Sequence, residues 1–266
     1  MSDAEILPPD HPLPPLSAGS PEGKPLAGRI ALVTGAGHGI GRAVAPLLAR
    51  AGAHVVAVSR PQSKAALEEL DDEITEATGE GATLVPLDIK DYGGIDNLGA
   101  GLYERFGKLD ILVSNAGLLG PLSPVGHYTP KEWDDVVAVN FTANYRLIRS
   151  MDPLLRLSDA GRALFVTSGA TQKNRAYWAG YAATKAALEK LVLTYAEEVA
   201  EKPMAVNLID PGATATHMRR AAFPGEDPAT LPSPADVARL YLAMVRPEFT
   251  QSGTRLRYRD WAAQAG

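Results

Sequence analysis

A tyrosine and a lysine lie four residues apart, at Tyr181 and Lys185, where an apolar pattern of helical spacing begins. Side chains at positions i and i+4 of a helix are neighbours, so the lysine charge is expected close to the tyrosine oxygen. A nearby positive charge favours the ionised phenol and lowers its pKa from about 10 toward the range of a proton-transfer group. The pair indicates acid–base chemistry, although two such residues also fall four apart by chance.

The helix that must position this pair is predicted from the residues that follow it. Leu188, Leu191, Val192, Tyr195 and Val199 recur at helical spacing and form an apolar stripe. Such a stripe must pack against another surface, which is either the rest of the chain or a partner subunit.

A glycine-rich segment at residues 34–41, Thr-Gly-Ala-Gly-His-Gly-Ile-Gly, follows an apolar run and precedes residues of helical spacing. A strand, a glycine-rich turn and a helix form the first unit of a dinucleotide-binding sheet. A Cβ here would block the approach of a pyrophosphate, and the helix N-terminus supplies N–H groups for the phosphates. Pro46 argues against a regular helix, since an internal proline costs about 3 kcal/mol or bends the helix. The predicted cofactor-binding residues of this segment are Gly35, Gly37, His38, Gly39, Ile40 and Gly41.

The end of the next predicted strand, residues 54–59, distinguishes between the two nicotinamide cofactors. A carboxylate there would bind the adenosine ribose of NAD and repel the 2′-phosphate of NADP. The strand instead ends in Ser59 and is followed by Arg60. A hydroxyl with a guanidinium binds phosphate well, and His38 adds a further donor. These residues favour NADP, with NAD as second choice; the alternative is that Arg60 is a solvated surface residue.

Predicted strands and helices alternate along the rest of the chain. Helices are expected over residues 64–78, 92–106 and about 130–157, and further strands over 82–88, 109–115, 162–168, 204–210 and 254–258. This alternation predicts a Rossmann-type α/β fold, a doubly wound parallel sheet of about seven strands with helices on both faces. Ligands bind at the carboxyl ends of such strands. The residues at these ends are Asp88, Asn115, Ala116, Gly117, Ser168, Pro211 and Gly212.

Composition limits the classes of function. The 266 residues suit one large domain, and the 45% hydrophobic and 21% charged content is that of a soluble globular protein. A net charge of −5 and a pI near 5.6 disfavour nucleic acid and anionic membranes as partners. The chain has no cysteine and only scattered histidines, so we expect no metal site.

The first 25 residues are rich in proline and lack both a positively charged start and an apolar segment, so they are not a signal peptide. We expect a flexible, polyproline-like arm over residues 1–25, with a segment that docks on a partner subunit as the alternative. A single catalytic domain over residues 26–266 follows. No run of 18 apolar residues occurs, which predicts no transmembrane span and a cytoplasmic protein.

With these residues placed, the chain resembles the short-chain dehydrogenases/reductases of the classical type, over roughly residues 26–260. Residues 34–41 match the TGxxxGxG loop of that family, and Ser168 precedes Tyr181 by 13 residues, as its catalytic serine does. The other matching positions, in the family's order, are Asn115-Ala116-Gly117, Asn140, Tyr181-x-x-x-Lys185, and Pro211-Gly212 with Thr216.

The resemblance implies roles for these residues. Tyr181 would be the general acid in carbonyl reduction and the general base in alcohol oxidation, while Ser168 would hold the substrate oxygen. Lys185 would lower the tyrosine pKa and bind the nicotinamide ribose. Asn140, on pattern alone a core asparagine, would position a water that links Lys185 to solvent. Thr216 would fix the nicotinamide carboxamide.

The implied activity is hydride transfer between NADP(H) and a carbonyl or secondary alcohol, in a homodimer or homotetramer. The tyrosine–lysine spacing and the chain length argue against the enoyl reductases and epimerases of the family. Residues 217–228 are the expected substrate loop, facing residues 173–178. The residues that this loop offers to a pocket are Met218, Arg219, Arg220 and Phe223.

The alternative to an enzyme is a catalytically silent dinucleotide-binding sensor or scaffold. Loss of Ser168, Tyr181 or Lys185 would indicate such a protein.

Overall fold

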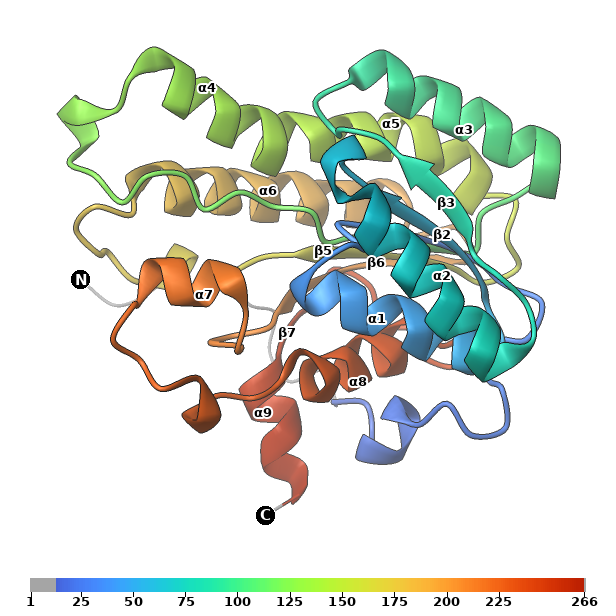
Figure 1. Cartoon of the computed structure of the whole chain (residues 1–266). Coiled ribbons are helices and arrows are strands. Elements are labelled where there is room, and N and C mark those ends of the chain that lie inside the picture. The colour runs from blue at the N-terminus through green and yellow to red at the C-terminus, as the bar shows by residue number, and fades with distance from the viewer. Residues whose placement is uncertain (1–12, 266) are drawn as a thin grey trace.

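The computed structural model describes residues 13–265 and contains a seven-stranded parallel sheet of order β3-β2-β1-β4-β5-β6-β7 (Figure 1). Successive strands run outward from β1 in one direction and from β4 in the other, so a topological switch point lies between them. The predicted Rossmann-type fold is thereby confirmed. The strands are β1 (Ile30–Thr34), β2 (His54–Ser59), β3 (Thr83–Pro86), β4 (Ile111–Ser114), β5 (Gly161–Val166), β6 (Met204–Asp210) and β7 (Arg255–Arg257).

Helices cover both faces of this sheet, because successive strand residues point to opposite sides. On β1, Val33 belongs to one apolar cluster and Leu32 to the other. The first cluster joins the sheet to α1, α2 and α8, and the second joins it to α3, α5 and α6 (Figure 1). The helices are α1 (Gly39–Arg50), α2 (Lys64–Thr78), α3 (Tyr92–Phe106), α4 (Pro130–Val137), α5 (Ala143–Leu155), α6 (Ala179–Glu198), α7 (His217–Ala222), α8 (Pro234–Val245) and α9 (Tyr258–Ala262).

The apolar stripe of α6 packs on the sheet of its own chain. Leu188, Val192, Tyr195 and Val199 are all buried within the second apolar cluster. This burial fixes the rotation of α6 about its axis, and therefore the direction in which Tyr181 and Lys185 point. Of the two alternatives for the stripe, the structure shows contact with the sheet.

The long helix expected over residues 130–157 is interrupted in its middle. A capping box between Thr129 and Glu132 begins α4, and a π-helical turn at Ala138–Thr142 separates α4 from α5. Such turns insert one extra residue into a helix and are common at functional sites. Asn140 lies within this turn and is fully buried.

Pro46 does not end its helix. Helix α1 continues past the proline to Arg50, and Pro46 is buried in the interior. The glycine-rich segment therefore leads into a helix of full length.

Part of the proline-rich arm packs on the domain. Residues 1–12 lie outside the described part of the chain, but Leu13, Leu16 and Ala18 contact the first apolar cluster. The indole N–H of Trp261 on α9 donates to the Pro14 carbonyl at 2.7 Å. Within the segment that we expected as a flexible arm, the turn at Leu16–Gly19 therefore packs on α8 of its own chain.

Across residues 13–265, none of the helices combines the length and the apolar character that a membrane span requires. In the same part of the chain, no three histidine or acidic side chains gather where a metal ion could be held.

Candidate active site

A cavity of about 1500 Å³ opens along the carboxyl edge of the sheet. It extends past the ends of β2 and β3 at one side and of β6 and β7 at the other. Three predicted site residues do not line it: Gly37 faces Ser59, Gly41 packs against Gly35, and Asn140 is buried behind Gly117. The predicted residues that line it are Gly35, His38, Gly39, Ile40, Ser59, Arg60, Asp88, Asn115, Ala116, Gly117, Ser168, Tyr181, Lys185, Pro211, Gly212 and Thr216.

The glycine-rich turn has the shape that a pyrophosphate requires. Gly35 and Gly39 adopt φ angles of +71° and +56°, which side chains rarely tolerate. A Cβ on Gly41 would collide with the Gly35 carbonyl oxygen, and one on Gly37 would lie 2.8 Å from the Ser59 hydroxyl. Because the turn is packed this tightly at the start of α1, its backbone fits the dinucleotide that the sequence predicts.

Hydroxyl and cationic groups gather where β2 ends. The His38 ring lies 3.1 Å from the hydroxyl of Ser63, and Ser59 lies against Gly37. Arg60 is exposed, lines the cavity, and has no carboxylate partner among the described residues. Ser63 was not predicted, because its place beside His38 follows from the fold of residues 60–63 rather than from a motif. This end of the cavity fits a phosphate group.

Thr34, at the end of β1, holds the segment 115–117 in place. Its hydroxyl accepts hydrogen bonds from the backbone N–H groups of Asn115 and Ala116 at 3.0 and 3.1 Å. The Asn115 side chain donates in return to the Thr34 carbonyl at 3.1 Å. These bonds tie the ends of β1 and β4 together, on either side of the topological switch point.

Tyr181 lies at the base of the cavity, only 8% exposed. Burial raises the pKa of its phenol to about 12, although a hydrogen bond with Ser168 opposes that shift. The expectation that Lys185 lowers this pKa is not met, because desolvation of the phenol dominates. The Lys185 ammonium lies 5.9 Å from the centre of the tyrosine ring and donates to the Val166 carbonyl at 2.8 Å.

Burial also changes the lysine. It lowers the pKa of Lys185 to about 8, and the carboxylate of Glu189, one helical turn further along α6, opposes that shift. Burial therefore favours the neutral phenol of Tyr181, which can donate a proton, and makes Lys185 lose its proton more readily than an exposed lysine.

Asn140 is fully hydrogen-bonded. Its amide accepts from the Leu118 N–H at 2.8 Å and donates to the Leu118 carbonyl at 2.8 Å and to the Thr184 hydroxyl at 3.2 Å. These bonds hold the loop after β4 against α6. That Asn140 also positions a water near Lys185 stays a prediction.

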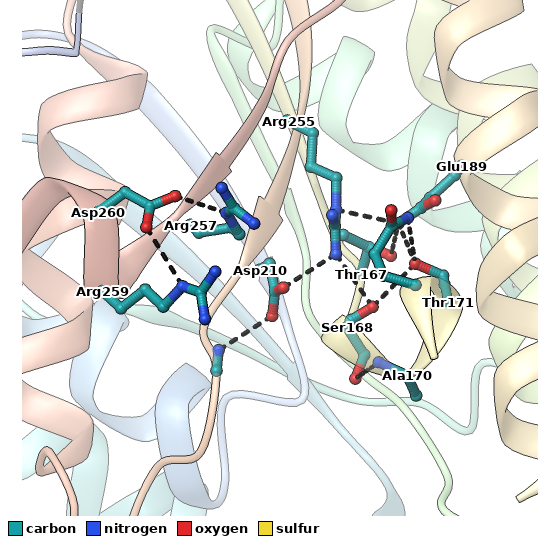
Figure 2. Close-up of polar contacts among 12 residues, drawn as sticks. Thr167, Ser168, Ala170, Thr171, Glu189, Asp210, Arg255, Arg257, Arg259 and Asp260 are labelled. Atoms are coloured by element: carbon teal, nitrogen blue, oxygen red, sulfur yellow. Dashed lines mark hydrogen bonds and ion pairs between the residues drawn. The ribbon is translucent and has the colours of Figure 1, made fainter. Parts of the chain in front are cut away.

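Sequence reasoning missed a buried ionic cluster beneath Ser168, formed by Arg255, Glu189 and Asp210. Arg255 is 3% exposed at its side chain and lies between the two carboxylates (Figure 2). Its Nη2 donates to Asp210 at 2.9 Å and to the Ser168 carbonyl at 3.1 Å, and its Nε forms an ion pair with Glu189 at 3.1 Å. The cluster thereby joins strand β7, helix α6 and the ends of β5 and β6 around the backbone of Ser168.

An aromatic wall extends from Tyr181 along the expected substrate loop. The rings of Tyr181 and Trp178 lie 6.0 Å apart in an edge-to-face arrangement, and Phe223 lies 5.7 Å beyond Trp178. Thr216 caps α7 by accepting from the Arg219 N–H, so part of this loop is helical. Met218 and Arg219 line the cavity as expected, whereas Arg220 and Phe223 do not.

Comparisons with known proteins agree with this geometry. A family model described as short chain dehydrogenase matches residues 29–227. The uncharacterized oxidoreductase YciK of Escherichia coli is 40% identical over 216 residues, covering 80% of this chain and 84% of that protein. A short chain dehydrogenase of Shigella flexneri, solved in complex with NADP, has a TM-score of 0.84 at 36% identity and covers 89% of this chain and 99% of its own. A second, from Escherichia coli and solved with NADPH, has a TM-score of 0.84 at 37% identity, with 89% and 98% covered.

Proposed function

Because the chain belongs to the short-chain dehydrogenase family and is therefore an NAD(P)-dependent oxidoreductase, we propose that it transfers hydride between NADP(H) and a carbonyl or secondary alcohol. The observation that carries this proposal is the pairing of Ser168 with a neutral, buried Tyr181 at the base of the cavity. A phenol and a hydroxyl that converge on one point can bind a single substrate oxygen.

In this proposal Tyr181 is the acid of carbonyl reduction. When bound, NADPH supplies the hydride, and the protein contributes alignment and proton transfer. The Tyr181 O–H donates its proton to the carbonyl oxygen as that oxygen becomes an alcohol. Ser168 donates a hydrogen bond to the same oxygen and stabilises its developing negative charge. Lys185 contributes a positive charge beside the phenol, and alcohol oxidation reverses each transfer.

The preference for NADP rests on the residues at the end of β2. Hydrogen-bond donors are available there on Ser59, Ser63 and His38, and Arg60 adds a positive charge without a carboxylate partner among the described residues. No carboxylate follows β2 directly to repel a 2′-phosphate. That two similar proteins were solved with NADP and NADPH supports the same assignment.

Cofactor titration tests the assignment directly. The purified protein is titrated with NADPH and with NADH, and nicotinamide fluorescence is followed. NADPH should bind about ten times more tightly than NADH, a difference in binding free energy of about 1.4 kcal/mol. Equal or tighter binding of NADH would reject the NADP preference. Cofactor binding with no turnover across a panel of ketones, aldehydes and secondary alcohols would reject the proposed reaction and favour a silent sensor.

We also propose that the protein is a homodimer or homotetramer of the cytoplasm. Trp133 on α4 and Tyr145 on α5 are 38% and 47% exposed on neighbouring helices, which suits contact with another subunit. Light scattering during size-exclusion chromatography should give twice or four times the chain mass. A monomer at micromolar concentration would contradict the proposal.

A further inference from the structure

The end of the cavity on the β5 to β7 side of the sheet is lined by cations from separate segments. Lys173 and Arg175 follow β5, and Arg257 and Arg259 lie at the end of β7 and on α9. In the sheet order, β5 and β7 lie on the opposite side of β4 from β2, where Arg60 lies. These charges are therefore distinct from the group that faces the cofactor phosphate.

The carboxylates nearby leave this end positive. Asp210 lines the cavity but is already paired with the buried Arg255. Arg257 and Arg259 share a single carboxylate, that of Asp260 (Figure 2). The whole chain carries a net charge of −5, so the local excess of positive charge is opposite in sign to that of the molecule. A cleft lined by one sign of charge concentrates ligands of the other sign.

Arg175 is the cation best placed to hold an anion. Its guanidinium lies 5.5 Å from the Trp178 ring centre and 5.1 Å from that of Phe223. Stacking restrains the arginine without using its N–H groups. Among the described residues its side chain has neither a hydrogen-bond acceptor nor a carboxylate partner, and it is exposed to the cavity.

Arg219 provides an internal contrast. It stacks on the same Phe223 ring, 3.8 Å from its centre, but Glu226 binds its guanidinium through two contacts of 2.5 and 2.6 Å. Its charge is therefore compensated, and its Nε and Nη2 donors are already used. Of the two arginines that stack on Phe223, only Arg175 keeps an uncompensated charge, which suits binding of a carboxylate or phosphate.

We propose that this end of the cavity binds an anionic group of the substrate, a carboxylate or a phosphate, with Arg175 as its principal donor. Arg257 and Arg259 add to the attractive field. The Trp178 ring lies between Arg175 and Tyr181, so the anion sits at a distance from the reacting carbonyl, with an apolar or aromatic segment between them. This inference rests on the proposed carbonyl reduction and names its substrate class.

Matched substrates test the proposal. The full-length enzyme with NADPH is assayed on 4-acetylbenzoate, on its methyl ester and on 4-acetylphenyl phosphate, in which an aromatic ring separates the ketone from the anion. The kcat/KM of at least one anionic ketone should exceed that of the neutral ester about tenfold or more, because the acid and its ester share the ketone and the ring and differ mainly in the charge. The anion with the higher kcat/KM shows whether the site binds a carboxylate or a phosphate. Equal kcat/KM values for the ester and both anions would overturn the proposal.

Variants assign the effect to one side chain. Arg175→Gln should abolish the preference for the anion, because kcat/KM for the acid falls toward that for the ester, and Arg175→Lys should retain part of the preference. Arg220→Gln is the matched control, since it removes the same charge from an exposed residue that does not line the cavity. An equal loss for acid and ester in Arg175→Gln, or the same loss of preference in Arg220→Gln, would overturn the assignment.

A binding measurement separates this proposal from the proposed reaction. Calorimetry of the protein with NADP compares the affinities for 4-acetylbenzoate and for its methyl ester without requiring turnover. Binding of the acid alone, lost in Arg175→Gln, would support the anion site even if no ketone were reduced. Indistinguishable affinities would reject the anion site even if the ester were reduced rapidly.

Discussion

The two ends of the cavity are built in different ways. The proposed cofactor end is shaped mainly by the backbone, through the left-handed Gly35 and Gly39 and the hydrogen bonds of Thr34. The proposed catalytic end is shaped by side chains, through Tyr181, the buried Arg255 and the rings of Trp178 and Phe223. A backbone turn is specified by a few consecutive residues, whereas a side-chain cluster requires several distant segments to fold together. Motifs therefore describe the first end better than the second.

Tyr181→Phe should show the largest difference between the two ends, with a large loss of turnover and little change in NADPH affinity. Removing the phenol oxygen deletes the proton donor, and general acid catalysis contributes about 10²–10⁴-fold to rates. The ring still fills its place against Trp178, so NADPH affinity should change less than about threefold, or 0.7 kcal/mol. Steady-state turnover and fluorescence titration measure the two quantities on one preparation. Turnover at the wild-type level would show that another group donates the proton.

Arg255→Leu should have the next largest effect, on stability as well as turnover. Glu189 and Asp210 would remain as buried carboxylates without their cation, and removing one partner of a buried ion pair costs about 3–5 kcal/mol. Urea denaturation should show this loss. The backbone of Ser168 would also lose its contact with Nη2, so kcat should fall more than NADPH affinity does.

A matched control distinguishes lost charge balance from lost packing. Adding Glu189→Gln and Asp210→Asn to the Arg255→Leu variant leaves no unpaired charge in the cluster. Most of the stability should return, because neutral amides cost less to bury than carboxylates do. If the triple variant were as unstable as the single one, the packing of Arg255 rather than its charge would stabilise this region.

The difference between local backbone turns and clusters of distant side chains also explains which features the sequence predicts. The helices at residues 64–78 and 92–106 and the strands at 54–59 and 204–210 match the structure, because apolar periodicity and flanking breakers are local signals. Arg255 lies 87 residues from the Ser168 carbonyl that it binds, and no local pattern signals that contact. The π turn around Asn140 and the docking of residues 13–19 depend likewise on tertiary packing. The pKa of Tyr181 depends on how deeply the phenol is buried, which spacing from Lys185 does not reveal.

The pH dependence of turnover should differ between the two directions. Reduction needs the protonated phenol, which persists at neutral pH because the pKa of Tyr181 is raised to about 12. Oxidation needs the phenolate, whose fraction rises about tenfold per pH unit below that pKa. Between pH 7 and 9, kcat for oxidation should therefore rise steeply while kcat for reduction does not. A plateau of oxidation below pH 8 would instead show that Lys185 lowers the tyrosine pKa during turnover, as the sequence predicts.

Arg60→Leu should have the smallest effect, confined to the cofactor end. The variant removes the uncompensated charge beside Ser59 but leaves the glycine-rich turn, the proposed site of the pyrophosphate common to both cofactors. NADPH affinity should fall about tenfold, the value of one charge-assisted hydrogen bond of about 1.5 kcal/mol, while NADH affinity stays constant. Fluorescence titration measures both. An equal loss for both cofactors would mean that Arg60 acts through the turn itself, and the backbone end would then depend on a side chain as the catalytic end does.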